Sequence, residues 1–305
     1  MESSSLRERA RTSTAADKEQ LSWREATQQL IEEKRYKKAL KKLLAVYDSR
    51  QPGRLDFSIY LIKNLAAVYE PAREALSERR DLKESLVLSG KADFSVVADW
   101  VQLNKSLNEE ERIFSVYKKV RKKKSTKKVA ENLLDYVWKK LVKRGDYNQL
   151  VPYFNQVISG VFLTASMYEG ELLFPTSKKD ASSKRFESLA KQIDLAKLTE
   201  EGPIIFELAL GLGQEPAARA VASRILKLKS GSKVYAALVK HAIKAGADDV
   251  AKDYFKEAKR KLSKEKFATV EKALKKALEA KDEDLKKAAE KQKSDKKKKK
   301  KRGQR

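Results

Sequence analysis

The sequence predicts an all-α protein, built as an antiparallel helix-hairpin array with disordered termini. Apolar residues recur at helical spacing along most of the 305-residue chain. Glycine and proline are scarce, with 11 and 6 residues, so few tight β-hairpin turns can form. Charged residues make up 37% of the chain, against about a quarter in typical domains. That excess favours a thin array with much surface over one globule, and the 41% of hydrophobic residues can still fill a sizeable core.

Paired helical patterns follow one another along the chain. Residues 1–18 form a polar arm without apolar periodicity, which predicts disorder. Apolar stripes then predict helices over residues 21–31, 36–47, 57–68, 94–107, 109–120, 133–142, 150–162, 204–212, 217–228, 234–243, 250–262 and 264–280. A further helix is predicted to begin at Pro71, since proline suits a first helical turn. Gly145, Gly213 and Gly246 mark turns between paired helices.

Polar segments divide the predicted array into domains. Residues 175–185 predict a linker between an N-terminal hairpin array at 19–174 and C-terminal helices at 186–280. Residues 121–128 predict a shorter, basic linker within the first array. Residues 281–305 predict a lysine-rich disordered tail, because like charges in an unbroken block repel one another and stay solvated.

Two of the predicted hairpins share an internal spacing. Trp23 precedes Ala39 by sixteen residues, and Tyr235 precedes Ala251 by the same number. The aromatic ring is expected to fill the groove between the helices, and the small residue lets them approach closely. Residues four and seven positions further on are expected to face the next hairpin. The predicted packing residues are Trp23, Ala39, Leu43, Val46, Tyr235, Leu238, Ala251, Phe255 and Ala258.

This spacing resembles the tetratricopeptide repeat, a helix–turn–helix unit of about 34 residues. The Gly145-Asp146-Tyr147 turn also resembles the inter-helix turn of that family. The repeats are degenerate, because Leu150 stands where a small residue is usual, and Thr27 and Val239 stand where glycine is usual. The resemblance implies a tetratricopeptide-like α-solenoid.

Three sequence stretches also resemble a group of bacterial tetratricopeptide-like proteins. They are Arg35 to Leu40, Tyr69 to Leu76 and Asn104 to Asn108. The resemblance covers roughly residues 20–230. It implies a fold and carries no known activity.

The sequence contains no conventional catalytic or cofactor motif. Cysteine is absent and His241 is the only histidine, so a cysteine-based metal site is excluded. His241 is expected to be a surface or groove residue. The Gly211-Leu212-Gly213 stretch lacks the third glycine and the preceding strand of a dinucleotide-binding loop. We therefore expect no enzyme activity and no cofactor.

No apolar run is long enough to predict a transmembrane helix. The first ten residues contain no apolar segment of the kind found in secretory signals, which predicts a cytoplasmic location.

Lysine dominates a formal net charge of +26, which predicts attraction to polyanions. Lysine is a hydrated point charge that distinguishes bases poorly, so binding to nucleic acid should be nonspecific and directed at phosphates. Tyr117 and Phe255 are the aromatic residues near basic runs, and both fit core stripes. The candidate anion-binding residues are Lys122, Lys123, Lys124, Lys127, Lys128, Lys296, Lys297, Lys298, Lys299, Lys300, Lys301 and Arg302.

These patterns leave several functions open. The first hypothesis is a non-catalytic scaffold that binds a protein or peptide, with the polybasic tail attracting anionic partners. The alternative is a basic protein associated nonspecifically with RNA or the ribosome. Third is a membrane-surface role for the helix at 264–280, although the same helix also suits capping the array. Under the alternative, the lysine-rich tail binds nucleic acid. The simplest hypothesis is that the tail only makes the protein soluble.

Overall fold

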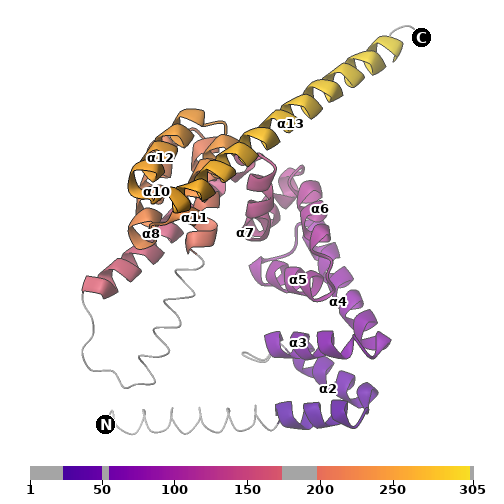
Figure 1. Ribbon diagram of the computed structural model, residues 1–305. Coiled ribbons are helices and arrows are strands. Elements are labelled where there is room, and N and C mark those ends of the chain that lie inside the picture. The colour runs from indigo at the N-terminus through magenta and orange to yellow at the C-terminus, as the bar shows by residue number, and fades with distance from the viewer. Residues whose placement is uncertain (1–22, 50–54, 174–197, 303–305) are drawn as a thin grey trace, which may run out of the picture. The chain divides into compact units, whose positions relative to one another are not determined.

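The computed structural model describes residues 23–49, 55–173 and 198–302 (Figure 1). Within these ranges the regular structure is helical and contains no strand, so the predicted all-α class is confirmed. The predicted arm at 1–18 and the linker at 175–185 lie outside the described residues.

Within the described ranges the helices succeed one another with short connections. In chain order they are residues 23–32, α2 Tyr36–Asp48, α3 Leu55–Leu65, α4 Glu70–Ser89, α5 Phe94–Ser106, α6 Glu110–Val120, η1 Lys124–Thr126, α7 Lys127–Lys143, η2 Tyr147–Leu150, α8 Val151–Leu173, residues 198–211, α10 Glu215–Leu228, α11 Ser232–Lys244, α12 Asp248–Lys261 and α13 Lys264–Arg302. The short η1 and η2 are 3₁₀-helices.

Four predicted helix bounds are wrong by six residues or more. Helix α8 ends at Leu173 rather than at 162, and the helix predicted at 204–212 is already helical from residue 198. Helix α7 begins at Lys127, six residues before the predicted start at 133. Helix α13 does not end at Ala280 but continues to Arg302, so residues 281–302 are helical rather than disordered. Lysine, glutamate and alanine are good helix formers, and neither glycine nor proline occurs in α13. Helix propensity therefore outweighs like-charge repulsion along this stretch.

The chain divides into two compact units, residues 1–137 and residues 138–305, within α7. This division differs from the predicted one at 175–185. Contacts across that segment explain the difference, because Lys139 binds Glu201 at 2.6 Å and Tyr147 binds Glu207 at 3.0 Å. Residues that precede and follow the predicted linker thus belong to one unit.

One turn geometry recurs in five hairpins with short connections, and its hydrogen bonds also occur at Gly90, where the next helix begins four residues later. Its central residue has a positive φ: Lys34 (57°), Asn108 (59°), Gly145 (73°), Gly213 (71°) and Gly246 (77°). In each turn the central N–H donates to the carbonyl three residues earlier, and the next N–H donates to the carbonyl five residues earlier. These bonds define the Schellman motif, which satisfies the last carbonyls of a helix. The next helical element begins two residues after the central residue in all five.

Aligning the hairpins on this turn places buried residues at the same three positions. Eleven residues before the centre are Trp23, Val97, Leu134, Gly202 and Tyr235, all buried. Five residues after it are Ala39, Ile113, Leu150, Ala218 and Ala251, each at most 4% exposed. Twelve residues after it are Val46, Val120, Val157, Ile225 and Ala258, each at most 8% exposed. The spacing of sixteen therefore recurs as a buried pair even where the residue types differ.

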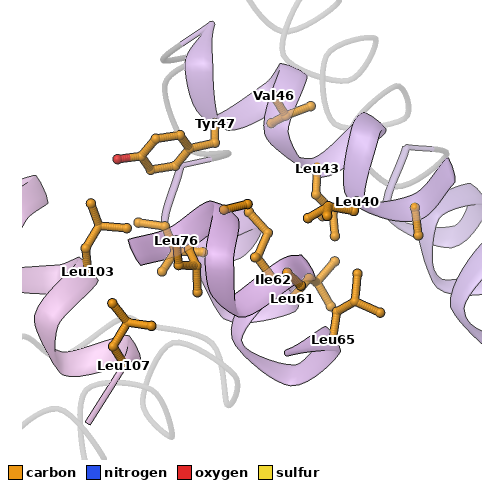
Figure 2. Packing of buried hydrophobic residues seen from close by; sticks show 14 of the residues in the cluster. Leu40, Leu43, Val46, Tyr47, Leu61, Ile62, Leu65, Leu76, Leu103 and Leu107 are labelled. Carbon is orange, nitrogen blue, oxygen red and sulfur yellow. The ribbon is translucent and has the colours of Figure 1, made fainter. Parts of the chain in front are cut away.

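Leucine and isoleucine form the core at the start of the first unit (Figure 2). Leu43 comes from α2, Ile62 from α3, Leu76 from α4 and Leu103 from α5, and none has exposed surface. Burying one such side chain contributes about 1.5–3 kcal/mol. Side chains from consecutive helices therefore hold neighbouring hairpins together.

Helix α13 packs along α11 in the second unit and then continues beyond α11 and α12 (Figure 1). Phe267 and Val270 of α13 are buried, and the Phe267 ring lies 5.0 Å from Phe255 of α12. Further along, the Lys281 ammonium is 2.7 Å from both carboxylate oxygens of Asp248. From Lys281 to Arg302, α13 extends by about 30 Å at 1.5 Å per residue.

Candidate functional site

Basic side chains gather where α6 meets α7, in a segment that we call the lysine corner, residues 118–128. It contains eight lysine or arginine residues and no acidic residue. All eight side chains are exposed: Lys118, Lys119, Arg121, Lys122, Lys123, Lys124, Lys127 and Lys128. Five of the predicted anion-binding residues thus lie together on the surface of the first unit.

The lysine corner is a folded turn and not the linker predicted from its sequence. The backbone N–H of Arg121 donates to Tyr117 O at 3.0 Å, and 3₁₀-helix η1 follows at Lys124–Thr126. Thr126 is buried, and its hydroxyl shares its hydrogen between the carbonyl oxygens of Val120 and Lys123. A charge run alone predicts solvation, whereas this buried hydroxyl fixes the backbone that presents the lysines.

A second contact supports the lysine corner from the α4–α5 connection. Gly90 has a φ of 80°, and a Cβ placed on it would collide with the backbone carbonyl of Ser125. Only glycine combines the left-handed conformation with this close approach. The corner is therefore braced by a residue 35 positions earlier in the sequence.

Lys118 and Lys119 lie in the last turn of α6, where the helix dipole favours positive charge, but folding does not account for the lysines from Lys122 onward. Among the described residues, Lys122, Lys123 and Lys124 form no salt bridge. Lys127 lies 3.8 Å from Glu131, and both side chains are exposed, so that pair contributes little. Positive charge at a helix N-terminus also opposes the helix dipole by about 0.3–1 kcal/mol per charge. The start of α7 therefore carries its charge at a cost in stability.

No aromatic ring is available in the lysine corner for stacking on a base. The residues 118–128 include no aromatic side chain, and the preceding Phe114 and Tyr117 are buried. Phe255, the other aromatic near a basic run, is half-buried against Phe267. The corner can therefore offer charge and hydrogen-bond donors to an anion, but not a stacking platform.

The remaining predicted anion-binding residues, Lys296 to Lys301 and Arg302, belong to the last turns of α13. They lie in the second unit, whereas the lysine corner lies in the first. The structure therefore distributes the two predicted basic regions between the two units.

Eight of the predicted packing residues are at most 8% exposed: Trp23, Ala39, Leu43, Val46, Tyr235, Leu238, Ala251 and Ala258. The ninth, Phe255, is half-buried. Its neighbour Tyr254 is more deeply placed, at 6% exposed, with its ring 5.6 Å from Phe206. Sequence spacing alone did not single out Tyr254.

A buried glutamate joins three helical segments of the second unit. Glu207 has no exposed side-chain surface and lies in the helix at 198–211. Its Oε1 accepts hydrogen bonds from the Tyr147 hydroxyl at 3.0 Å and from Lys244 Nζ at 2.6 Å. Its Oε2 lies 2.5 Å from Nδ1 of His241. We call Glu207, Tyr147, His241 and Lys244 the Glu207 cluster.

The groups around Glu207 are closely packed. Lys244 Nζ also donates to Val142 O at 3.1 Å. A Cβ on Gly211 would collide with the ring of Tyr147, so glycine makes room for that ring. Burial, followed by the negative charge of Glu207, raises the pKa of the Tyr147 hydroxyl. Because the Glu207 carboxylate is fully enclosed, it links helices and offers no surface of its own to a substrate.

Sequence reasoning identified His241 as a surface or groove residue and missed its partners. The available signal was Glu207 itself, a lone acid within the apolar run from Ile204 to Leu212. His241 and Lys244 lie three residues apart, on one face of a helix. A buried acid facing two such residues is a pattern that a sequence search could test.

The described residues contain no group of three or more histidine or carboxylate side chains placed to hold a metal ion. No helix among them combines the length and apolar character needed to cross a membrane. Comparison with protein-family models, with curated proteins and with solved structures gives no significant match.

Proposed function

We propose that this protein is a non-catalytic scaffold of degenerate tetratricopeptide-like repeats that binds a protein or peptide partner. The observation that carries the proposal is the Schellman turn that recurs in five hairpins with buried residues at matching positions. Turn centres lie 33 residues apart from Gly213 to Gly246 and 37 apart from Asn108 to Gly145. These intervals are close to the repeat length of about 34 residues.

Stacked helical hairpins supply a surface as well as a core. Each hairpin buries one side of its helices against its neighbours and leaves another side available. Helix faces from successive hairpins can then form an extended surface for a partner. The lysine-rich segments would add electrostatic attraction to an acidic partner and speed its association.

A second candidate function is nonspecific association with nucleic acid. The lysine corner favours it, because its cations are exposed and lie on a folded backbone, and Lys122, Lys123 and Lys124 form no salt bridge among the described residues. Such binding would be directed at phosphates and would weaken steeply with salt.

Affinity capture with the full chain tests the scaffold proposal. Captured proteins are compared in low salt, in about 0.5 M salt, where surface charges are screened within a few ångström, and after RNase treatment. The scaffold proposal expects a partner that resists both treatments and binds the purified chain directly.

A chain lacking residues 291–305 serves as a second sample. A scaffold should retain its salt-resistant partner without this tail, since the hairpins make the contact. Loss of every captured protein on RNase treatment or in high salt would overturn the scaffold proposal and leave the second candidate.

A further inference from the structure

We propose that the lysine corner is a docking surface for the sugar–phosphate backbone of nucleic acids and binds without base preference. The inference rests on the second candidate function and assigns it to residues 118–128 of the first unit. It does not depend on the lysines at the end of α13.

The first argument is the way in which the charge is presented. The described backbone of the corner is held by the buried Thr126 hydroxyl and by Gly90. Cations on a fixed backbone lose less conformational freedom on binding than cations on a flexible segment. Double-stranded DNA carries one negative charge per about 1.7 Å of its axis. A cluster of eight exposed cations without an acid matches such a dense polyanion.

The second argument distinguishes nucleic acid from an acidic protein. Protein interfaces are depleted in lysine, and their strongest contacts come from tryptophan, tyrosine and arginine. The corner has seven lysines, one arginine and no aromatic residue. Its composition therefore suits phosphates, which a point charge can bind without fixed geometry.

The third argument distinguishes nucleic acid from a membrane surface. Insertion into a membrane interface needs an apolar face beside the basic residues. Val120, the only aliphatic side chain in the corner, is 1% exposed, and Thr126 is 2% exposed. The corner therefore lacks a side chain that could enter the lipid.

The same features predict that the corner does not distinguish one nucleic-acid sequence from another. Base recognition uses bidentate arginine, asparagine or glutamine contacts, and single-strand binding uses aromatic stacking. The corner has no asparagine or glutamine, no exposed aromatic ring and a single arginine, Arg121. Duplexes of different sequence should therefore bind the corner with the same affinity.

The test measures binding of the full chain to two fluorescent duplexes of equal length and unrelated sequence across a range of salt. The corner variant is Lys122→Ala with Lys123→Ala and Lys124→Ala. The matched control is Lys272→Ala with Lys275→Ala and Lys276→Ala, which removes the same charge from exposed positions of α13. Each lost phosphate contact should reduce the slope of log affinity against log salt by about 0.9.

Three lost contacts reduce that slope by about 2.7. From about 50 to 200 mM salt, the wild type should then lose about 40-fold more affinity than the corner variant. The control variant should keep the wild-type slope within about one unit. A variant with arginine at 122, 123 and 124 should restore the slope, because it restores the charges.

Four results would overturn the proposal or a part of it. Equal slopes for the wild type and the corner variant would assign binding to another surface while sustaining the second candidate function. No duplex binding by the wild type would overturn both. Binding to phosphatidylserine vesicles that depends on the corner, with duplex binding unaffected, would make the corner a lipid surface. A difference between the two duplex sequences that the corner variant abolishes would overturn the absence of base preference.

Discussion

Replacing Glu207 by glutamine tests whether the buried cluster holds the second unit together. Glutamine keeps the volume of glutamate and one acceptor oxygen, but it removes the negative charge. The groups around it are donors: the Tyr147 hydroxyl, the Lys244 ammonium and the nearby His241 ring. The new amide NH₂ must then face at least one of these donors, and it cannot accept from them.

The magnitude follows from burial and charge. Losing a hydrogen bond to a charged group costs about 1.5–3 kcal/mol, and breaking a buried ion pair costs about 3–5 kcal/mol. Lys244 has 36% of its side chain exposed and can turn towards water, which places the cost at the lower end. We expect a loss of about 2–3 kcal/mol.

Glu257 provides a matched control for Glu207. It accepts from the Tyr235 hydroxyl at 3.0 Å and from Lys261 at 2.7 Å. These distances nearly equal those at Glu207, but 28% of the Glu257 side chain is exposed. Exposed ion pairs contribute about 0.2–1 kcal/mol, so Glu257→Gln should cost about 1 kcal/mol or less.

Hydrogen exchange of the backbone amides measures the free energy of local opening in both variants. The measurement therefore does not require the two units to unfold together. Protection in α11 and in the helix at 198–211 should fall about 30- to 160-fold for Glu207→Gln. The control Glu257→Gln should lower protection about fivefold or less. Equal losses in the two variants would refute the conclusion that burial makes Glu207 the stronger link.

Backbone geometry and pKa give three further predictions. Lys34→Gly should stabilise the chain by about 1 kcal/mol and Gly246→Ala should destabilise it by a similar amount in urea unfolding, since both positions are left-handed; equal signs would contradict the turn geometry. Gly160→Ala should raise stability by about 1 kcal/mol in thermal unfolding, because nothing lies within 4 Å of the added Cβ in α8; a loss would indicate an unrecognised contact. Burial raises the pKa of Tyr254 from 10.0 to about 12, and that of Tyr147 is also raised. In the folded state these pKa values exceed the tyrosine pKa of the unfolded chain, so the two tyrosines contribute stability below pH 10, and this contribution is lost as the pH rises towards 12. Circular dichroism and phenolate absorbance should therefore change together. Phenolate formation well before unfolding would contradict this prediction.

The helix order could be predicted because the signals for it are local. Apolar stripes predicted the helices at 94–107 and 109–120, which the structure has as α5 Phe94–Ser106 and α6 Glu110–Val120. Glycine marked the turns at Gly145, Gly213 and Gly246. Lys34 and Asn108 adopt the same turn without glycine, so residue type alone hides the repetition that the backbone shows.

The features that sequence reasoning missed depend on contacts between distant residues. Glu207 meets Tyr147, 60 residues earlier, and Lys244, 37 residues later. Gly90 supports Ser125 through an approach that no periodicity encodes. A run of charges is locally compatible with both a flexible linker and a folded corner, and the buried Thr126 and the close approach of Gly90 distinguish them.

Several acids of the first unit are placed where they join helices. Arg80 of α4, 5% exposed, contacts Glu109 at the start of α6. Lys83 of α4 lies 3.1 Å from Asp99 of α5, with only 13% of each side chain exposed. Arg112 of α6 lies 2.6 Å from Glu84 of α4.

The lysine corner follows the opposite principle within the same unit. Its segment has no acid, and Lys124, Lys127 and Lys128 stand where a helix dipole favours negative charge. A single acidic residue in this segment would lower that cost, as acids do at the start of α6. Charge that opposes the fold yet sits on a braced backbone is typical of a surface retained for binding. The contrast within one unit therefore favours an external polyanion as the counterpart of these lysines.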